Sequence, residues 1–306
     1  MEYVVETQDL TRVFGSFTAV DRLNIKIKAG EIYGFLGPNG AGKSTAIRML
    51  CGILQPSAGS ATILGYDLLR ETEKIKSHIG YMSQKFSLYD DLTVLENLNF
   101  YAGIYRIPRK ERQTRIQEMV AMAGLTGREK ELVAHLSGGW KQRLALGCAI
   151  IARPAIVFLD EPTSGVSPTS RRMFFNIIQG LAHQGATIMV TTHFMDEAER
   201  CHKIAFISAG KLLAVDTPDY LKKNTIEGSL VELAIPQAME KISALEKLPY
   251  VKDCTIHGSL LHVLLDHERH LGDLRDFSGG EPRPIVPSLE DVFMALTKRQ
   301  RGERDA

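Results

Sequence analysis

The sequence has few cysteines and no closely spaced cysteine pair. Its 306 residues contain four cysteines and a single tryptophan. No signal-peptide pattern is found, so we expect the thiols to be reduced and structural, in a cytoplasmic protein. The four are Cys51, Cys148, Cys201 and Cys254.

The chain also lacks an excess of one charge and a long apolar run. Its net charge is +1, which predicts no nucleic-acid-binding surface. The longest apolar region, residues 144–159, is interrupted by Arg153 and Pro154 and is shorter than the roughly 20 residues that span a bilayer. If the protein works at a membrane, another chain must therefore cross it.

The composition, 44% apolar and 24% charged, is ordinary for a soluble globular protein of one large or two moderate domains. The hydrophobic pattern predicts antiparallel strands first and then alternating strands and helices, which favour a parallel sheet covered by helices. A capping-box pattern, Thr93 to Glu96, opens a helical region of about 90–150. The expected strands are 3–10, 18–28, 31–36, 155–160, 186–192 and 203–208, and the expected helices are 45–54, 109–123, 168–183 and 195–201.

The organisation changes after residue 226. Strands are expected at 229–235, 250–257 and 259–265, and helices at 237–247 and 288–298, the last capped by Ser288 and Asp291. We therefore predict a first domain over 1–226, a small α+β domain over 227–298 and a disordered tail over 299–306.

A glycine-rich segment follows the apolar strand 31–36 and precedes a helix. Its glycines allow backbone N–H groups to surround phosphate oxygens, and the helix N-terminus adds a positive dipole. Lys43 can reach the β- and γ-phosphates, and the Ser44 hydroxyl can bind Mg²⁺. The segment matches GxxxxGK[ST] and consists of Gly37, Pro38, Asn39, Gly40, Ala41, Gly42, Lys43, Ser44 and Thr45.

Two carboxylates and two polar residues are further candidates for the site. Asp160 ends an apolar strand, where it can hold Mg²⁺, and Glu161 can take a proton from an attacking water. An Asp–Glu pair can also simply cap a turn. His193 and Gln84 are ordinary loop residues when taken alone, and they acquire a role only by comparison with a known family.

A second anion-binding pattern opens an apolar helix with Ser137, Gly138 and Gly139 after Leu136. It could be a simple N-cap. As a second phosphate site it has no evident purpose in one chain, but it has one if a second copy supplies it across an interface.

Together these motifs resemble, over residues 3–225, the nucleotide-binding subunits of ATP-binding cassette (ABC) transporters. The resemblance implies a P-loop NTPase fold with a parallel-rich core sheet, an antiparallel β subdomain and an α-helical subdomain, followed here by the small C-terminal domain. It implies ATP and Mg²⁺ as ligands. It also implies that ATP binding joins two cassettes, each closing Ser137 and Gly139 on the γ-phosphate held by the other, and that ATP hydrolysis separates them.

The resemblance also assigns roles to single residues. Glu161 becomes the catalytic glutamate and His193 the switch histidine at the γ-phosphate. Asp160 becomes the metal-binding aspartate, and Gln84 the glutamine near Mg²⁺ and the attacking water. Phe14 falls where the family stacks an aromatic ring under adenine, with Phe17 as the second candidate. Either ring could instead belong to the core.

Two positions depart from the family pattern. Trp140 occupies a signature position usually filled by Gln, and Ser167 replaces the usual Asp of the D-loop, the segment 164–168. The loss of this charge puts coupling between the two nucleotide sites in question and leaves homodimer and heterodimer both open.

The segments 191–201 and 287–293 are similar to ATPase subunits of bacterial multidrug, daunorubicin-type, lipid and sodium exporters. This likeness implies a separate membrane permease, export, and a position on the cytoplasmic face of the cell membrane. A groove near residues 84–105 is expected to receive the permease. Leu88, Tyr89 and Leu92 could supply its apolar contact or could equally belong to the local core. The transported substrate is not encoded in any of these motifs.

A soluble ABC ATPase acting on ribosomes, DNA or complex assembly is the alternative. Such proteins usually carry coiled-coil insertions or tandem cassettes, and neither pattern occurs here. A P-loop kinase or GTPase would leave the Ser137 motif unexplained, and no Asn-Lys-x-Asp motif is present.

Overall fold

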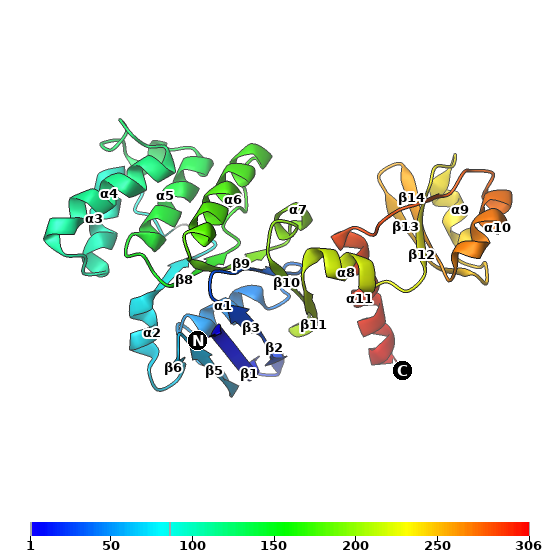
Figure 1. Cartoon of the computed structure of the whole chain (residues 1–306), viewed down its shortest axis with the longest axis horizontal. Coiled ribbons are helices and arrows are strands. Elements are labelled where there is room, and N and C mark those ends of the chain that lie inside the picture. The colour runs from blue at the N-terminus through cyan, green and yellow to red at the C-terminus, as the bar shows by residue number, and fades with distance from the viewer. Residues whose placement is uncertain (1, 86, 306) are drawn as a thin grey trace. The chain divides into compact units, whose positions relative to one another are not determined.

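The computed structural model describes residues 2–85 and 87–305, which form two compact units (Figure 1). The units are Met1–Thr217 and Pro218–Ala306. This division falls before α8 (Pro218–Asn224) rather than at 226, because α8 contacts α11 (Leu289–Asp305) of the second unit.

A six-stranded sheet in the order β11-β10-β4-β9-β8-β7 forms the centre of the first unit. All pairs are parallel except β10 with β11. The three strands β4, β8 and β9 are buried throughout, as expected of a parallel sheet covered on both faces. The strands are β4 (Ile32–Leu36), β7 (Ile79–Met82), β8 (Ile156–Asp160), β9 (Thr187–Thr192), β10 (Lys203–Ser208) and β11 (Lys211–Asp216).

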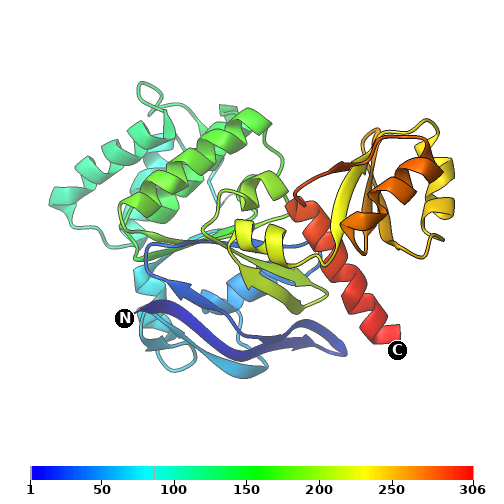
Figure 2. The same cartoon turned by 45° about the vertical axis from the view of Figure 1, so that its right-hand side comes forward.

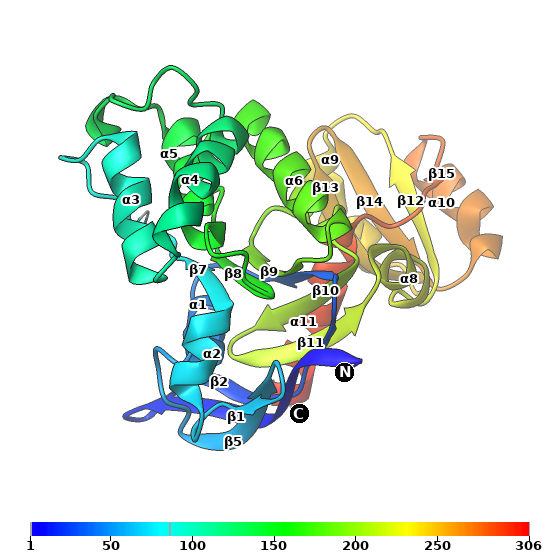
Figure 3. The same ribbon diagram turned by 60° about the vertical axis from the view of Figure 1, so that its left-hand side comes forward.

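An antiparallel sheet, β2-β1-β5-β6 with β3 paired to β1, forms a second layer. The single strand expected over 18–28 is two strands, one ending at Leu23 and one starting at Lys26. Between them, the Asn24 side chain bonds Asp9. Helix α1 (Lys43–Leu50) lies between the two sheets, where Ile47 and Leu50 join one core (Figure 3). The strands are β1 (Tyr3–Phe14), β2 (Phe17–Leu23), β3 (Lys26–Lys28), β5 (Ala58–Ile63) and β6 (Tyr66–Asp67).

Most of the remaining helices of the first unit group on one side of the central sheet (Figure 1). The capping box is confirmed: Thr93 Oγ1 accepts from the Glu96 backbone, and the Glu96 carboxylate accepts from the Thr93 backbone. Gly124 ends α4 in a left-handed conformation, as its position predicts. The helices are α3 (Val94–Ile104), α4 (Arg109–Ala123), α5 (Gly138–Ile150), α6 (Pro168–His183) and α7 (Met195–Ala198), with a 3₁₀ turn at Val133–His135. Helix α2 (Thr72–His78), away from this group, has no counterpart among the expected elements.

The second unit is built on an antiparallel sheet in the order β13-β14-β12-β15. Two helices, α9 and α10, cover one face and share its apolar core (Figure 2). Helix α10 has no counterpart in the predicted elements. Helix α11 continues to Asp305 through the segment expected to be disordered, in which the helix-forming residues are Arg, Gln and Glu. The elements are β12 (Ser229–Leu233), α9 (Ala238–Leu245), β13 (Val251–His257), β14 (Leu260–Leu265), a 3₁₀ turn (Glu268–His270), α10 (Leu271–Ser278) and β15 (Arg283–Pro284).

The cysteines and the apolar helices can be compared with the expectations from the sequence. All four cysteines are buried and unbonded to one another. Within the described ranges, no helix combines the length and apolar character needed to span a bilayer.

The capping box gives the first test. Thr93→Ala removes the cap of α3, and we expect the unfolding free energy of the first unit to fall by about 1 kcal/mol. Trp140, the only tryptophan, lies in this unit and reports its unfolding by fluorescence in urea. Thr114→Ala, the same change at an exposed position inside α4, is the control. Equal effects of the two changes would contradict the role of the cap.

Candidate nucleotide-binding site

The glycine-rich segment forms a tight loop between β4 and α1. Gly42 precedes α1 with φ +103°, and a Cβ there would lie 2.3 Å from the Ala19 carbonyl oxygen. A Cβ on Gly37 would lie 2.2 Å from the Ile207 carbonyl oxygen. Only glycine fits at these two positions. The loop therefore presents the free N–H groups of the first turn of α1, a geometry suited to anions.

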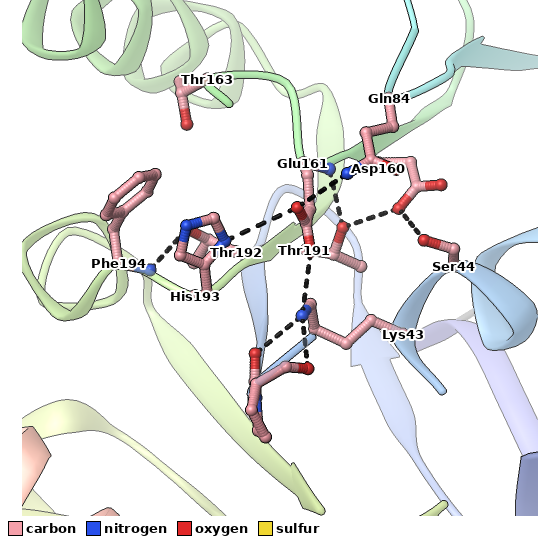
Figure 4. Close-up of polar contacts among 12 residues, drawn as sticks. Lys43, Ser44, Gln84, Asp160, Glu161, Thr163, Thr191, Thr192, His193 and Phe194 are labelled. Carbon is pink, nitrogen blue, oxygen red and sulfur yellow. Dashed lines mark hydrogen bonds and ion pairs between the residues drawn. The ribbon is translucent and has the colours of Figure 1, made fainter. Parts of the chain in front are cut away.

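Lys43, the first residue of α1, is buried at the base of this loop. Its Nζ donates to the carbonyl oxygens of Gly37 and Pro38 at 2.7 and 3.0 Å. It also lies 2.9 Å from Glu161 Oε1, and the two side chains are only 3% and 7% exposed. The result is a buried ion pair that links the loop to the end of β8 (Figure 4).

Ser44 and Asp160 lie beside this pair. Asp160 Oδ1 accepts hydrogen bonds from Ser44 Oγ at 2.8 Å and from Thr191 Oγ1 at 3.0 Å. Burial raises the pKa of Asp160, and the hydrogen bonds from Ser44 and Thr191 reduce this effect. Asp160 Oδ2 is buried and has no hydrogen-bond partner.

This arrangement fits a divalent cation with a preference for oxygen ligands. The Ser44 hydroxyl and the Asp160 carboxylate are hard oxygen donors from the loop and from a strand end. The unpartnered Asp160 Oδ2 is the atom that a cation would satisfy. Gln84 is the third expected ligand. Its amide nitrogen donates a hydrogen bond to a neighbouring carboxylate, so its amide oxygen is available to a cation.

That carboxylate is Glu161, which the structure surrounds with polar groups. Gln84 Nε2 donates to Glu161 Oε2 at 3.1 Å, and His193 Nδ1 lies 3.5 Å from the same oxygen. Glu161 adopts φ +44°, a left-handed conformation that costs about 1 kcal/mol for a residue with a side chain. Its backbone N–H donates to Thr191 Oγ1 at 2.8 Å, which holds this conformation. Figure 4 shows these side chains converging from different strands.

Sequence reasoning missed Glu197, a buried residue behind the site. Its carboxylate accepts short hydrogen bonds from Thr163 and Thr192, and Arg171 Nε lies 3.5 Å away. Thr163 follows Glu161, and Thr192 precedes His193, so Glu197 joins the two loops. Burial raises the pKa of Glu197, and the hydrogen bonds from Thr163 and Thr192 offset only part of this rise. An acidic residue four positions after His193 is the signal that could have revealed it.

The expected second anion site opens α5. Ser137 is the N-cap residue of α5 with an extended backbone and an unused side chain, and Ser137 and Gly138 are exposed. Among the described residues, no hydrogen bond or ion pair joins Ser137, Gly138 or Gly139 to Lys43 and its neighbours. The structure therefore places these two groups of residues in one unit but not in one cluster.

Trp140 and Ser167, the two positions that depart from the family pattern, both have partners within this chain. The Arg128 guanidinium lies 3.8 Å from the Trp140 ring centroid, a cation–π contact. Ser167 caps α6 by accepting from the Ser170 backbone N–H at 3.3 Å. Each residue thus has a structural role within its own chain.

The two aromatic candidates lie on the β1–β2 hairpin. Phe14 and Phe17 are paired in register and are 44% and 62% exposed. The Arg12 guanidinium lies 4.5 Å from the Phe14 ring centroid. Neither ring is buried, so the alternative that either ring belongs to the core is wrong.

The family described as ABC transporter matches residues 20–164 of this chain. The chain is 47% identical to the probable multidrug ABC transporter ATP-binding protein YbhF of Escherichia coli over 237 residues, which are 78% of this chain and 41% of that protein. It therefore spans less than half of that relative. It is 32% identical to the linearmycin resistance ATP-binding protein LnrL of Bacillus subtilis, over 97% of this chain and 99% of that protein.

A solved structure supports the same likeness. The post-hydrolysis dimer of the ATP-binding cassette MJ0796, bound to ADP and Pi, superposes with a TM-score of 0.64 at 28% identity. The match covers 70% of this chain and 98% of that one. The P-loop cassette fold predicted from the motifs is thereby confirmed.

Glu197 gives the second test. Glu197→Ala leaves two buried hydroxyl groups without an acceptor, and we expect a loss of about 1–3 kcal/mol in the unfolding free energy of the first unit. Glu197→Gln keeps one acceptor oxygen and should cost less. Trp140 fluorescence in urea measures both, with Asp196→Ala, an exposed neighbour, as the control. A Glu197→Ala protein as stable as the parent would exclude this role.

Proposed function

Because the chain belongs to the ATP-binding subunits of ABC transporters, we propose that it binds and hydrolyses ATP and couples ATP-driven cassette dimerisation to export through a separate membrane permease. The observation that carries the proposal is the convergence of Lys43, Asp160 and Glu161 on the loop ahead of α1. A buried ammonium, a carboxylate with a free oxygen and a second carboxylate beside a histidine match the needs of phosphoryl transfer to water.

We assign a role in nucleotide binding to each group of residues at the site. The backbone N–H groups of the loop, residues 37–45, bind the phosphate oxygens, and Lys43 adds charge at the β- and γ-phosphates. Phe14 stacks on the adenine. Ser44, Asp160 and the Gln84 amide oxygen hold Mg²⁺, which when bound neutralises phosphate charge.

Glu161 acts as the general base for the attacking water, and His193 contacts the γ-phosphate. The 2.9 Å contact between Lys43 and Glu161 adds a physical link between binding and catalysis. An incoming phosphate competes with Glu161 for the Lys43 ammonium. Binding of the triphosphate thus frees the Glu161 carboxylate to accept a proton from water.

Ser137 and Gly138, which are exposed, and the adjacent Gly139 act on a second cassette. A helix N-terminus with an uncommitted serine hydroxyl is suited to bind the γ-phosphate held by a partner. ATP then joins the two cassettes, and hydrolysis releases them, an order-and-release switch driven by phosphate contacts. The partner is a copy of this chain or a related cassette.

The proposed place of action is the cytoplasmic face of a bacterial membrane, on permease subunits. The multidrug and resistance descriptions of the relatives support a transporter subunit over an ATPase acting on ribosomes, DNA or complex assembly. The described residues of the range 84–105 remain the proposed permease surface, and Phe86 lies outside the described residues. Exposed Tyr89 and Phe100, in edge-to-face contact with centroids 4.7 Å apart, lie within it.

Lys43 provides a test of ATP binding. Lys43→Ala removes a buried positive charge from the phosphate site, and we expect the affinity for ATP to fall about 10- to 100-fold, as for loss of a charge-assisted hydrogen bond. Titration with labelled ATP measures it. Lys74→Ala, an exposed lysine of α2, should bind like the parent. Unchanged affinity of the Lys43 variant would refute the assignment.

Glu161 provides a test of hydrolysis. Glu161→Gln keeps the size of the side chain but cannot accept a proton, so we expect phosphate release to fall by roughly 10²- to 10⁴-fold while ATP still binds. Glu73→Gln, at a highly exposed position, is the matched control. If the Glu161 variant hydrolysed ATP at the parental rate, another group would have to be the base.

A further inference from the structure

The second unit contains a cluster of two histidines and an aspartate that nucleotide chemistry does not use. The residues are His257 at the end of β13, His262 in β14 and Asp291 in the first turn of α11. One possible ligand atom from each residue lies within 4.8 Å of the others.

The strand register places both histidines on the same face of the sheet. Thr255 pairs with His262 and His257 pairs with Leu260, so the two histidines are diagonal neighbours across the β13–β14 hairpin. The alternate residues of β14, Leu261, Val263 and Leu265, point to the apolar core under α9 and α10. His262 therefore points to the opposite face, where it lines a small cavity with Asp291 and Met294.

The two carboxylate oxygens of Asp291 have different partners. Its Oδ2 accepts from the backbone N–H and the hydroxyl of Ser288 at 2.8 and 2.6 Å, completing the cap of α11. Its Oδ1 lies 2.8 Å from His262 Nδ1 and 3.6 Å from His257 Nε2. Burial alone would raise the pKa of Asp291, but the hydrogen bonds from Ser288 and His262 outweigh it and lower the pKa. The Oδ1 atom of Asp291 therefore faces two imidazoles.

From this geometry we propose that His257, His262 and Asp291 form a binding site for a divalent transition-metal ion such as Zn²⁺. Two imidazole nitrogens and one carboxylate oxygen are ligands that Zn²⁺ commonly takes, with a water in the fourth position. In a tetrahedral site with bonds of about 2.0–2.1 Å, the ligand atoms lie about 3.3 Å apart. The distances of 2.8 and 3.6 Å from Asp291 Oδ1 lie on either side of this value.

Binding needs only a small rearrangement. The metal replaces the proton that His262 Nδ1 donates to Asp291, so that proton leaves to solvent. The two imidazole rings are stacked, with centroids 4.0 Å apart and planes 8° from parallel, so one ring must turn for both nitrogens to converge. His257 is the ring that can turn, since its side chain is 30% exposed, against 9% for His262 and 5% for Asp291. The same exposure admits the water ligand.

Such an ion would join the β13–β14 hairpin to the start of α11, segments that lie far apart in sequence. A ligand that binds the folded unit but not the unfolded chain stabilises the folded unit. The predicted consequence is therefore a metal-dependent stability of the second unit, independent of ATP.

Calorimetric titration of ZnCl₂ into the untagged, chelator-treated full chain without nucleotide tests the proposal. We expect a binding event of one Zn²⁺ per chain that His257→Gln weakens at least tenfold. His257 is chosen because it is the most exposed of the three, and far-UV circular dichroism verifies its fold. His270→Gln is the matched control, since His270 Nδ1 lies 2.7 Å from Asp273 Oδ2 in the same unit. It should bind Zn²⁺ like the parent.

Co²⁺ provides a second readout on the parent chain alone, through its visible absorption in a site with imidazole ligands. Absence of a stoichiometric Zn²⁺ event, or of the Co²⁺ band, would overturn the proposal. It would also be overturned if His257→Gln and His270→Gln affected binding equally. None of these outcomes depends on ATP hydrolysis.

Discussion

The buried contact between Lys43 and Glu161 is the interaction around which the first unit is organised. Two opposite charges removed from water are costly unless they are closely paired and further hydrogen-bonded. Here the ammonium also donates to Gly37 and Pro38, and the carboxylate accepts from Gln84. Removing either charge leaves the other uncompensated. The loop, the end of β8 and the Gln84 segment therefore depend on one another for their polar contacts.

The parallel sheet explains how residues from distant segments reach this contact. The central strands β4, β8 and β9 are adjacent and parallel, so their carboxyl ends lie at one edge of the sheet. The glycine-rich loop, Asp160–Glu161 and Thr191–His193 each lie at one of these ends or directly after it. Glu197 then ties the last two segments together through Thr163 and Thr192. The second unit is built differently, with antiparallel strands and its own apolar core.

Features of the structure that depend on a few neighbouring residues were predicted from the sequence. The capping box at Thr93 and Glu96 and the glycine after α4 are local devices, and both form as expected. Gly37 to Thr45 and Asp160–Glu161 belong to compact motifs that can be read from the sequence, and the strand order of the structure brings them together. The break between the two strands in 18–28 and helix α10 were not predicted, because no short pattern in the sequence marks them. The cation–π contact of Arg128 with Trp140 is of the same kind, because its partners come from separate segments.

The central claim is that phosphate and Glu161 compete for one ammonium, and affinity for a nonhydrolysable ATP analogue measures this most directly. With Mg²⁺ and the analogue, removal of the Glu161 charge in a glutamine variant should tighten binding several-fold, since Lys43 then has no anionic competitor. Gln84→Ala, which also removes a contact to Glu161 but no charge, should not tighten it. Equal or weaker affinity of the glutamine variant would contradict the account.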